Sequence, residues 1–298
     1  MSVRHHVVKS IDHAIRFGLL LCVIISVLTT IAVVVLMGRE SWAFFERVSV
    51  LEFLFGTQWT PLLEPKSFGV LPLVVGTLVI VVGSMALALP AGMLVAVFLS
   101  EFSSERLRSW MKPILELLAG IPTVVYGYFA LSFVTPLLAT VFPQIQVFNA
   151  LSASIVVGIM ILPMICSLCD DAFRAVPTAT KEGAYALGAT PYEVISHIVI
   201  PAASSRIGAA SILAISRAVG ETMAVVLAAG ATPNMSLNPL EGVQTMTAYI
   251  VQVAMGDVQA GGIEYLSSFA VGILLFVMTL TMNIVGNHLI FRAPRTSA

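Results

Sequence analysis

The sequence predicts an all-α integral membrane protein in which six helices cross the bilayer. Of its 298 residues, 58% are hydrophobic and only 10% are charged, whereas soluble domains carry about 25% charged residues. Apolar windows of about 20 residues, the length that spans a bilayer, recur along the chain. We place the six predicted spans at 17–37, 70–99, 113–138, 150–168, 206–231 and 268–291.

The first predicted span, 17–37, follows a basic start that contains Arg4, Lys9 and Arg16. Its apolar core is longer than that of a signal peptide, and no A-x-A-like cleavage site follows it. We therefore expect a retained membrane helix, preceded by an N-terminal segment at residues 1–16.

Two later spans contain residues that bend helices. Pro90 lies inside span 70–99, which is long enough to require tilt or a kink. Gly120 and Pro122 lie inside span 113–138 and predict a second kink.

Glu116 is a charged residue near the predicted start of the third span. It follows Pro113 by three residues, and a carboxylate is favoured at a helix N-terminus. We therefore expect Glu116 to have a structural role at that end.

Two connecting segments on the opposite side from the N-terminus are longer than turns. Residues 41–59 predict a short helix that opens at Ser41, with Trp42, Phe45 and Phe55 suited to the membrane interface. Residues 243–255 predict a surface helix. Each is suited either to contact an external partner or to stabilise the fold as an interfacial helix.

The distribution of lysine and arginine predicts the orientation, because cytoplasmic loops carry an excess of these residues. With a cytoplasmic N-terminus, only Arg39, Arg47 and Lys66 are external. We therefore expect both termini in the cytoplasm, the C-terminal one at 292–298, and an external segment at 38–69. The predicted cytoplasmic residues are Arg4, Lys9, Arg16, Arg106, Arg108, Lys112, Arg174, Lys181, Arg206, Arg292 and Arg295.

Several classes of function are disfavoured. The net charge of −1 gives no sign of a nucleic-acid partner. Cys166 and Cys169 have no second pair to complete a zinc set, and the five histidines form no ligand cluster. No G-x-x-x-x-G-K-[ST] phosphate loop is present, so we do not expect this chain to hydrolyse ATP.

The predicted cytoplasmic loop at 170–205 is too long for a turn. Pro177 and Thr178 predict a helix that runs to about residue 187. Gly188 suits the position just beyond it, where the backbone is left-handed.

A second helix is predicted directly after that turn. Thr190 is its N-cap, Pro191 takes the first helical position, and Glu193 completes a capping box. Pro201 predicts a break before the fifth span. The resulting helix, turn and helix suit either docking and force transmission or a plain amphipathic connector.

Arg217 and Glu221 are charges inside the fifth span, 206–231. A charged residue near mid-bilayer costs about 2.5–3.5 kcal/mol, whereas a helical i,i+4 pair returns only about 0.2–0.5 kcal/mol. Stability therefore explains the pair poorly, and such residues usually face a bundle interior or a watery path. Gly220, between them, permits close helix approach or eases a bend.

The loop resembles the coupling loop of binding-protein-dependent ABC importer permeases. The motif of that family is E-A-A, three residues, Gly, nine residues and I-x-L-P, and the stretch EGAYALGA…IVIP is similar to it. Gly183 stands in place of the second alanine and Ile200 in place of the leucine. The matching residues are Glu182, Ala184, Gly188, Ile198 and Pro201.

Other stretches narrow the resemblance to the phosphate-specific permeases. These are SFGVLPLVVGTL at 67–78, FLSE at 98–101, LLAGIPTVVYG at 117–127 and RAVGETMAV at 217–225. GETMAV, together with the external FGTQW, resembles the C-type subunit more than its A-type partner. The resemblance implies a MetI-like core of five helices at 70–291 in the bacterial inner membrane, with 38–69 in the periplasm.

The resemblance also implies the partners. These are a homologous A-type permease subunit, a dimer of cytoplasmic ATPase subunits that bind ATP and Mg²⁺, a periplasmic phosphate-binding protein, and membrane lipid. No cofactor is expected in this chain.

We hypothesise that Arg217 faces the translocation path and contacts phosphate through its planar guanidinium. Glu221 would position Arg217 or accept a hydrogen bond from a protonated phosphate oxygen, and the latter would favour phosphate over sulfate. A static salt bridge is the structural alternative. Other functions remain open: a permease for sulfate or molybdate, a membrane component of phosphate signalling, or a secondary transporter.

Overall fold

The computed structural model describes residues 2–292, which fold into α-helices interrupted by three π-helical turns. Within this part of the chain there is no β-strand, only an isolated bridge between Trp59 and Phe68. The all-α prediction is confirmed. The α-helices are α1 (Ser2–Phe45), α2 (Val50–Phe55), α3 (Leu71–Val97), α4 (Glu105–Ala119), α5 (Thr123–Phe129), α6 (Thr135–Ala139), α7 (Ala150–Arg174), α8 (Thr178–Ala186), α9 (Pro191–Val194), α10 (Ile200–Val219), α11 (Met223–Ala229), α12 (Met246–Met255) and α13 (Ile263–Arg292). The π-helical turns are η1 (Phe98–Phe102), η2 (Ala130–Val134) and η3 (Ile195–Val199).

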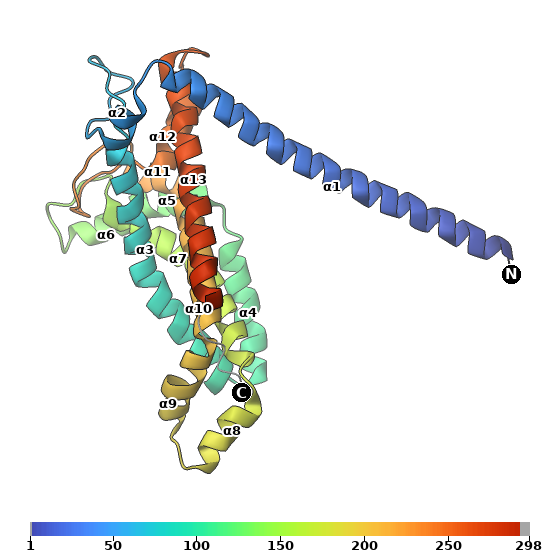
Figure 1. Cartoon of the computed structure of the whole chain (residues 1–298). Helices are drawn as coiled ribbons and strands as arrows, with labels where there is room; N and C mark the ends of the chain where they lie inside the picture. The colour runs from blue at the N-terminus through green and yellow to red at the C-terminus, as the bar shows by residue number, and fades with distance from the viewer. Residues whose placement is uncertain (1, 293–298) are drawn as a thin grey trace.

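The long helices are sufficient for a multi-pass membrane bundle. Among the described residues, five helices are long and apolar enough to cross a membrane, and six crossings result if one bent pair counts as a single span. Helices α3, α7, α10 and α13 run along the bundle, with α2 at one end and α8 and α9 at the other (Figure 1). Of the predicted C-terminal tail, residues 293–298 lie outside the described residues.

The predicted third span is not continuous. Helix α4 and the helical run Thr123–Ala139 meet at an angle of 85°. The backbone N–H of Gly120 closes α4 by donating to the carbonyls of Glu116 and Leu117, and Pro122 cannot donate to a continued helix. The expected kink is therefore a break.

This break also changes the place of Glu116. Helix α4 begins at Glu105, where the Ser104 hydroxyl accepts a hydrogen bond from the Leu107 N–H. Glu116 lies one turn from the C-terminal end of α4 rather than at an N-terminus. The expected helix-dipole role is therefore wrong.

Helix α1 extends further than predicted. It continues without interruption to Phe45, so no new helix opens at Ser41. All side chains at 15–36 are exposed, and α1 projects away from the bundle (Figure 1). Among the described residues, α1 packs on the rest of the chain through its contact with α13 and through Phe44 near its end.

Helices α3 and α7 form the centre of the bundle, and α4 and α10 also pack against α7. Glycines bring α3 and α7 close together. A Cβ atom added at Gly92 would lie 2.7 Å from Cγ2 of Ile165, and one at Gly158 would lie 3.0 Å from Cδ2 of Leu87. Close approach of this kind maximises van der Waals contact between membrane helices.

An aromatic cluster holds together the end of the bundle that carries α2. Phe44 at the end of α1 packs edge-on against Phe53 and Phe68, and Trp59 packs edge-on against Tyr249 of α12. Edge-to-face rings add about 0.5–1.5 kcal/mol per pair beyond area burial. The cluster therefore fixes the end of α1 to the segment between α1 and α3 and to α12.

The α12 helix is not the surface helix expected from residues 243–255. Residues 243–249 are all buried, and the backbone N–H of Met246 donates to the Thr77 hydroxyl of α3 at 3.1 Å. The apolar sequence is explained by packing inside the protein.

Outside the aromatic cluster, Lys66 lies 2.6 Å from Glu264, and the hydrogen bond to that carboxylate raises the pKa of Lys66.

We expect Gly76→Ala to destabilise the fold. A Cβ atom at Gly76 would lie 2.3 Å from the backbone oxygen of Gln244, and backbone cannot move aside as a flexible side chain does. Overpacking of this kind costs about 1–3 kcal/mol. Thermal unfolding of the detergent-purified protein should show a lower midpoint. Gly38→Ala is the control, because nothing lies within 4 Å of that position. Equal midpoints for the two variants would contradict the described packing of α3 on Gln244.

Candidate functional site

The predicted fifth span also contains a break. Helix α10 ends at Val219, Gly220 is its C-cap, and α11 begins at Met223. Arg217 and Glu221 are therefore not an i,i+4 pair on one helix, and the expectation that they are is wrong. The side chains at the break bond to nearby backbone, which competes with helix continuation: the Thr222 hydroxyl donates to the Gly220 carbonyl at 3.1 Å.

Glu221 is held within the break and points to the helix that follows. Its side chain is buried, and Oε1 accepts the backbone N–H of Ala224 at 3.2 Å. Its carbonyl accepts the Thr247 hydroxyl of α12 at 2.7 Å. These bonds satisfy backbone groups that a broken membrane helix would otherwise leave without partners. Glu221 therefore links α11 and α12.

Arg217 lies apart from Glu221, in the last turn of α10. The ion pairs between described residues do not include these two side chains, and the Arg217 side chain makes no hydrogen bond or ion pair in that part of the chain. It lines a cavity of about 410 Å³, together with Lys112, Glu116 and Asp170. A cation is favoured at a helix C-terminus, and the Arg217 guanidinium is free to bind an anion that enters the cavity.

The two breaks lie side by side in the fold. Helices α5 and α11, which follow the breaks, pack against each other, and a Cβ atom added at Gly127 would lie 2.8 Å from Cβ of Leu227. Helices α4 and α10, which precede the breaks, contribute Glu116 and Arg217 to the cavity. The broken geometry thus brings two distant charges to one cavity.

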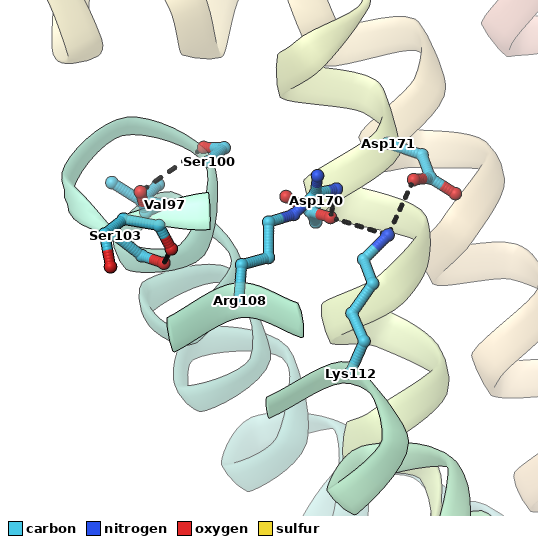
Figure 2. A network of polar contacts seen from close by, with 8 residues as sticks. Val97, Ser100, Ser103, Arg108, Lys112, Asp170 and Asp171 are labelled. Carbon is cyan, nitrogen blue, oxygen red and sulfur yellow. Dashed lines mark hydrogen bonds and ion pairs between the residues drawn. The ribbon is translucent and has the colours of Figure 1, made fainter. Parts of the chain in front are cut away.

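Ion pairs close the end of this cavity that lies toward α8. Asp170 of α7 is fully buried, and its Oδ2 accepts from Arg108 at 2.5 Å and lies 3.1 Å from the Lys112 ammonium. Lys112 also lies 3.4 Å from Asp171. Figure 2 shows both cations reaching from α4 to the α7 carboxylates. The i,i+4 spacing of Arg108 and Lys112 places them on one helix face.

The loop at 170–205 has most of its predicted local structure. Helix α8 begins at Thr178, and Gly188 has a φ of +86°, as the left-handed turn requires. Thr190 and Glu193 form the reciprocal bonds of a capping box. These three predictions are confirmed.

The predicted break at Pro201 is wrong. Residues Pro191–Val219 form one helical run, in which the π-helical turn η3 ends at Val199, two residues before Pro201. A π-turn shifts the hydrogen-bond ladder, which accommodates a residue that cannot donate.

The residues of the loop motif occupy different environments. Glu182, Gly183, Gly188 and Pro201 are exposed, whereas Ala184 and Ile198 are half-buried. The tip beyond them is apolar and open: the exposed fraction is 91% for Leu187 and 76% for Tyr192. Such a tip is available for contact with another protein.

An ion pair that the sequence analysis did not identify joins the loop to the bundle. Lys181 of α8 lies 2.6 Å from Glu101 of η1, and both side chains are largely buried. The two residues are 80 positions apart. Helix α8 is therefore tied directly to the end of α3.

Comparison with known proteins places this geometry among transport proteins. A family model described as "Binding-protein-dependent transport system inner membrane component" matches residues 88–293. The Bacillus subtilis protein "Probable ABC transporter permease protein YqgH" is 32% identical over 260 residues, which cover 87% of this chain and 84% of that protein. The Mesorhizobium japonicum "Phosphate transport system permease protein PstC" is 34% identical over 295 residues, which cover 90% and 89%.

Solved structures show the same fold. A bacterial ABC transporter that imports alginate aligns with a TM-score of 0.61 at 16% identity, covering 86% of this chain and 88% of that one. The MetNI methionine ABC transporter aligns with a TM-score of 0.57 at 16% identity, covering 76% and 95%. The predicted MetI-like fold is confirmed.

We expect the side-chain oxygen Oε1 of Glu221 to stabilise the break as a hydrogen-bond acceptor rather than through its negative charge. Glu221→Gln keeps an acceptor for the Ala224 N–H, whereas Glu221→Ala removes it and should cost about 0.5–2 kcal/mol, the usual effect of losing a helix cap. Thermal unfolding of the two variants in detergent measures the difference. An equal loss of stability in both would show that the negative charge itself is required.

Proposed function

Because the chain belongs to the family of binding-protein-dependent transport system inner membrane components, we propose that it is a permease subunit of an ATP-driven phosphate importer. The observation that carries this proposal is the similarity, over about nine-tenths of the chain, to a permease named for phosphate transport. The cavity adds chemical support, because Arg217 lines it without a partner among the described residues. The relatives give no support to sulfate or molybdate.

Arg217 is the residue that we assign to phosphate. Its guanidinium presents a planar fork that matches two phosphate oxygens, and it lies at the point where α10 stops. Gly220 shapes this end of the path. Glu221 acts beside the path as the support of α11, since its Oε1 is engaged by Ala224. This chain would supply half of the pathway and the homologous A-type subunit the other half.

The loop at 177–201 couples this path to ATP hydrolysis. A dimer of cytoplasmic ATPase subunits, which bind ATP and Mg²⁺, would dock on the exposed tip around Leu187 and Tyr192. Glu182, Gly183 and Gly188 give the loop its exposed surface and its turn. Ala184, Ile198 and Pro201 connect it to the bundle. This chain performs no chemical step.

The surroundings follow from the same proposal. The chain would lie in the bacterial inner membrane with both termini in the cytoplasm. A periplasmic phosphate-binding protein would deliver the anion to the end that carries α2 and α12. The ion pair between Lys181 and Glu101 would transmit motion of α8 to α3.

The test of Arg217 is ATP-dependent uptake of radiolabelled phosphate by the complete complex in proteoliposomes. Arg217→Gln should abolish uptake, and Arg217→Lys should reduce it at least about tenfold, because a lysine keeps the charge but loses the bidentate fork. Co-purification of the ATPase subunits controls for assembly. Uptake at the wild-type rate in an assembled Arg217→Gln complex would remove Arg217 from the path, and transport of sulfate in place of phosphate by the wild type would contradict the substrate.

A charge swap tests whether the ion pair between Lys181 and Glu101 couples α8 to α3. Lys181→Glu or Glu101→Lys alone should lower phosphate uptake per ATP hydrolysed, because each puts two like charges together. The double variant should recover it, with an interaction energy of about 0.5–3 kcal/mol. The matched control swaps Lys66 and Glu264, which form a 2.6 Å pair in the segments before α3 and at the start of α13. Independent, additive effects at 181 and 101 would contradict a direct tie.

A further inference from the structure

We propose that Arg108 and Lys112 form a second oxyanion site at the inner end of the cavity, which Asp170 occupies when phosphate does not. This inference rests on the proposed phosphate import and deepens it. Arg217 would be the first cation that the anion meets, and this pair the last before the cytoplasm. Asp170 is then a specificity residue as well as a contact between helices.

The geometry around Asp170 is that of two cations converging on one anionic oxygen. Arg108 and Lys112 both approach Oδ2, at 2.5 and 3.1 Å. They project from the same face of α4 toward α7 (Figure 2). Charge-assisted bonds from Arg and Lys serve carboxylates and phosphates alike. A phosphate oxygen can therefore replace the carboxylate oxygen without a change in the two donors.

The contact of Asp170 with Arg108 and Lys112 leaves buried polar atoms without partners, which is unusual for a purely structural salt bridge. Oδ1 of Asp170 and Nε of Arg108 are both buried and have no hydrogen-bond partner. Buried polar groups are nearly always satisfied, and an unsatisfied one costs about 1–3 kcal/mol. A phosphate ion has four oxygens and carries at least one proton at neutral pH. It can accept hydrogen bonds from Arg108 and Lys112 and donate one from its protonated oxygen to Oδ1 of Asp170.

The charges around the cavity favour an anion at this place. The two positive charges of Arg108 and Lys112 exceed the one negative charge of the buried Asp170. Asp171, the second carboxylate near Lys112, is 64% exposed, so solvent screens its charge. Arg217 adds a further positive charge to the lining, and Glu116 is the carboxylate that opposes it. Lys112 and Asp170 line the same cavity as Arg217, so an anion leaving Arg217 reaches them without crossing another layer of protein.

In this proposal Asp170, rather than Glu221, recognises the proton that phosphate carries. Glu221 already accepts from Ala224 and is absent from the cavity lining. Asp170 has a free acceptor oxygen and lies in that lining. Sulfate has no proton to donate at neutral pH and would leave Oδ1 unsatisfied.

The position of Asp170 also links the anion to the coupling loop. Asp170 lies in the last turns of α7, which ends at Arg174, and α8 begins at Thr178. When phosphate takes Arg108 and Lys112, the direct bonds of these α4 residues to Asp170 of α7 are lost. Arrival of the anion and loosening of the inner end of the cavity are then one event.

The experiment measures how phosphate on the cytoplasmic side inhibits uptake. The complete complex is reconstituted in proteoliposomes with ATP in the lumen and binding protein outside, and the lumen is preloaded with unlabelled phosphate or sulfate. Asp170→Asn removes the competing carboxylate, so the luminal phosphate concentration that halves uptake should fall about tenfold, the value of one charge-assisted bond. Sulfate should inhibit the wild type more weakly than phosphate and should inhibit Asp170→Asn about equally. Asp171→Asn, the same change one residue later, should leave the half-inhibiting concentration unchanged.

A second variant tests the site if Asp170→Asn fails to assemble, since that change leaves the largely buried Arg108 without its carboxylate partner. Lys112→Gln keeps the pair between Arg108 and Asp170 and removes one phosphate donor. Its half-inhibiting phosphate concentration should rise about tenfold. A purely structural contact would lower assembly or thermal stability and leave that concentration unchanged in Lys112→Gln, which would overturn the inference. A wild-type complex that imports phosphate but is not inhibited by luminal phosphate would also overturn it, whereas a wild-type complex that imports a different anion would contradict the proposed function instead.

Discussion

Every backbone polar group inside a bilayer must find its partner within the protein, and the arrangement of this bundle depends on how two broken helices meet that requirement. At the first break, the Gly120 N–H returns to carbonyls of α4. At the second, the side chains of Glu221 and Thr222 bond to neighbouring backbone. The short helices that follow, α5 and α11, pack on each other. The breaks are stable because they are paired, and pairing them creates the cavity between α4, α7 and α10.

The features that the sequence predicted correctly are those that depend on local pattern. Long apolar windows identified the helices, and the Thr190–Glu193 capping box and the left-handed Gly188 were read from residues a few positions apart. The breaks were harder to predict. Gly120 and Pro122 indicate a bend but not its angle, and Gly220 is as typical of close helix packing as of a helix end.

The contacts that decide the site lie far apart in the sequence. Glu221 is stabilised in its break by Thr247, and the loop is tied to the bundle through Lys181 and Glu101, 80 residues apart. In the sequence alone, Lys181 and Glu101 are seen only as charged residues outside the predicted spans. Asp170 was likewise counted within the loop, although it is a buried residue of α7. The i,i+4 spacing of Arg108 and Lys112 was a visible signal, but the carboxylate that they share was not.

Helix α1 shows that this chain does not supply all of its own surroundings. Its apolar side chains from Ile15 to Leu36 touch little of the chain to which they belong, whereas the end that carries Phe44 enters a packed cluster. Burial normally determines how a helix is oriented, because the hydrophobic and dispersion terms are proportional to contact. For most of α1 that contact must come from lipid or from another chain. The tilt of α1 is therefore a property of the assembled membrane complex, and the isolated subunit leaves it undetermined.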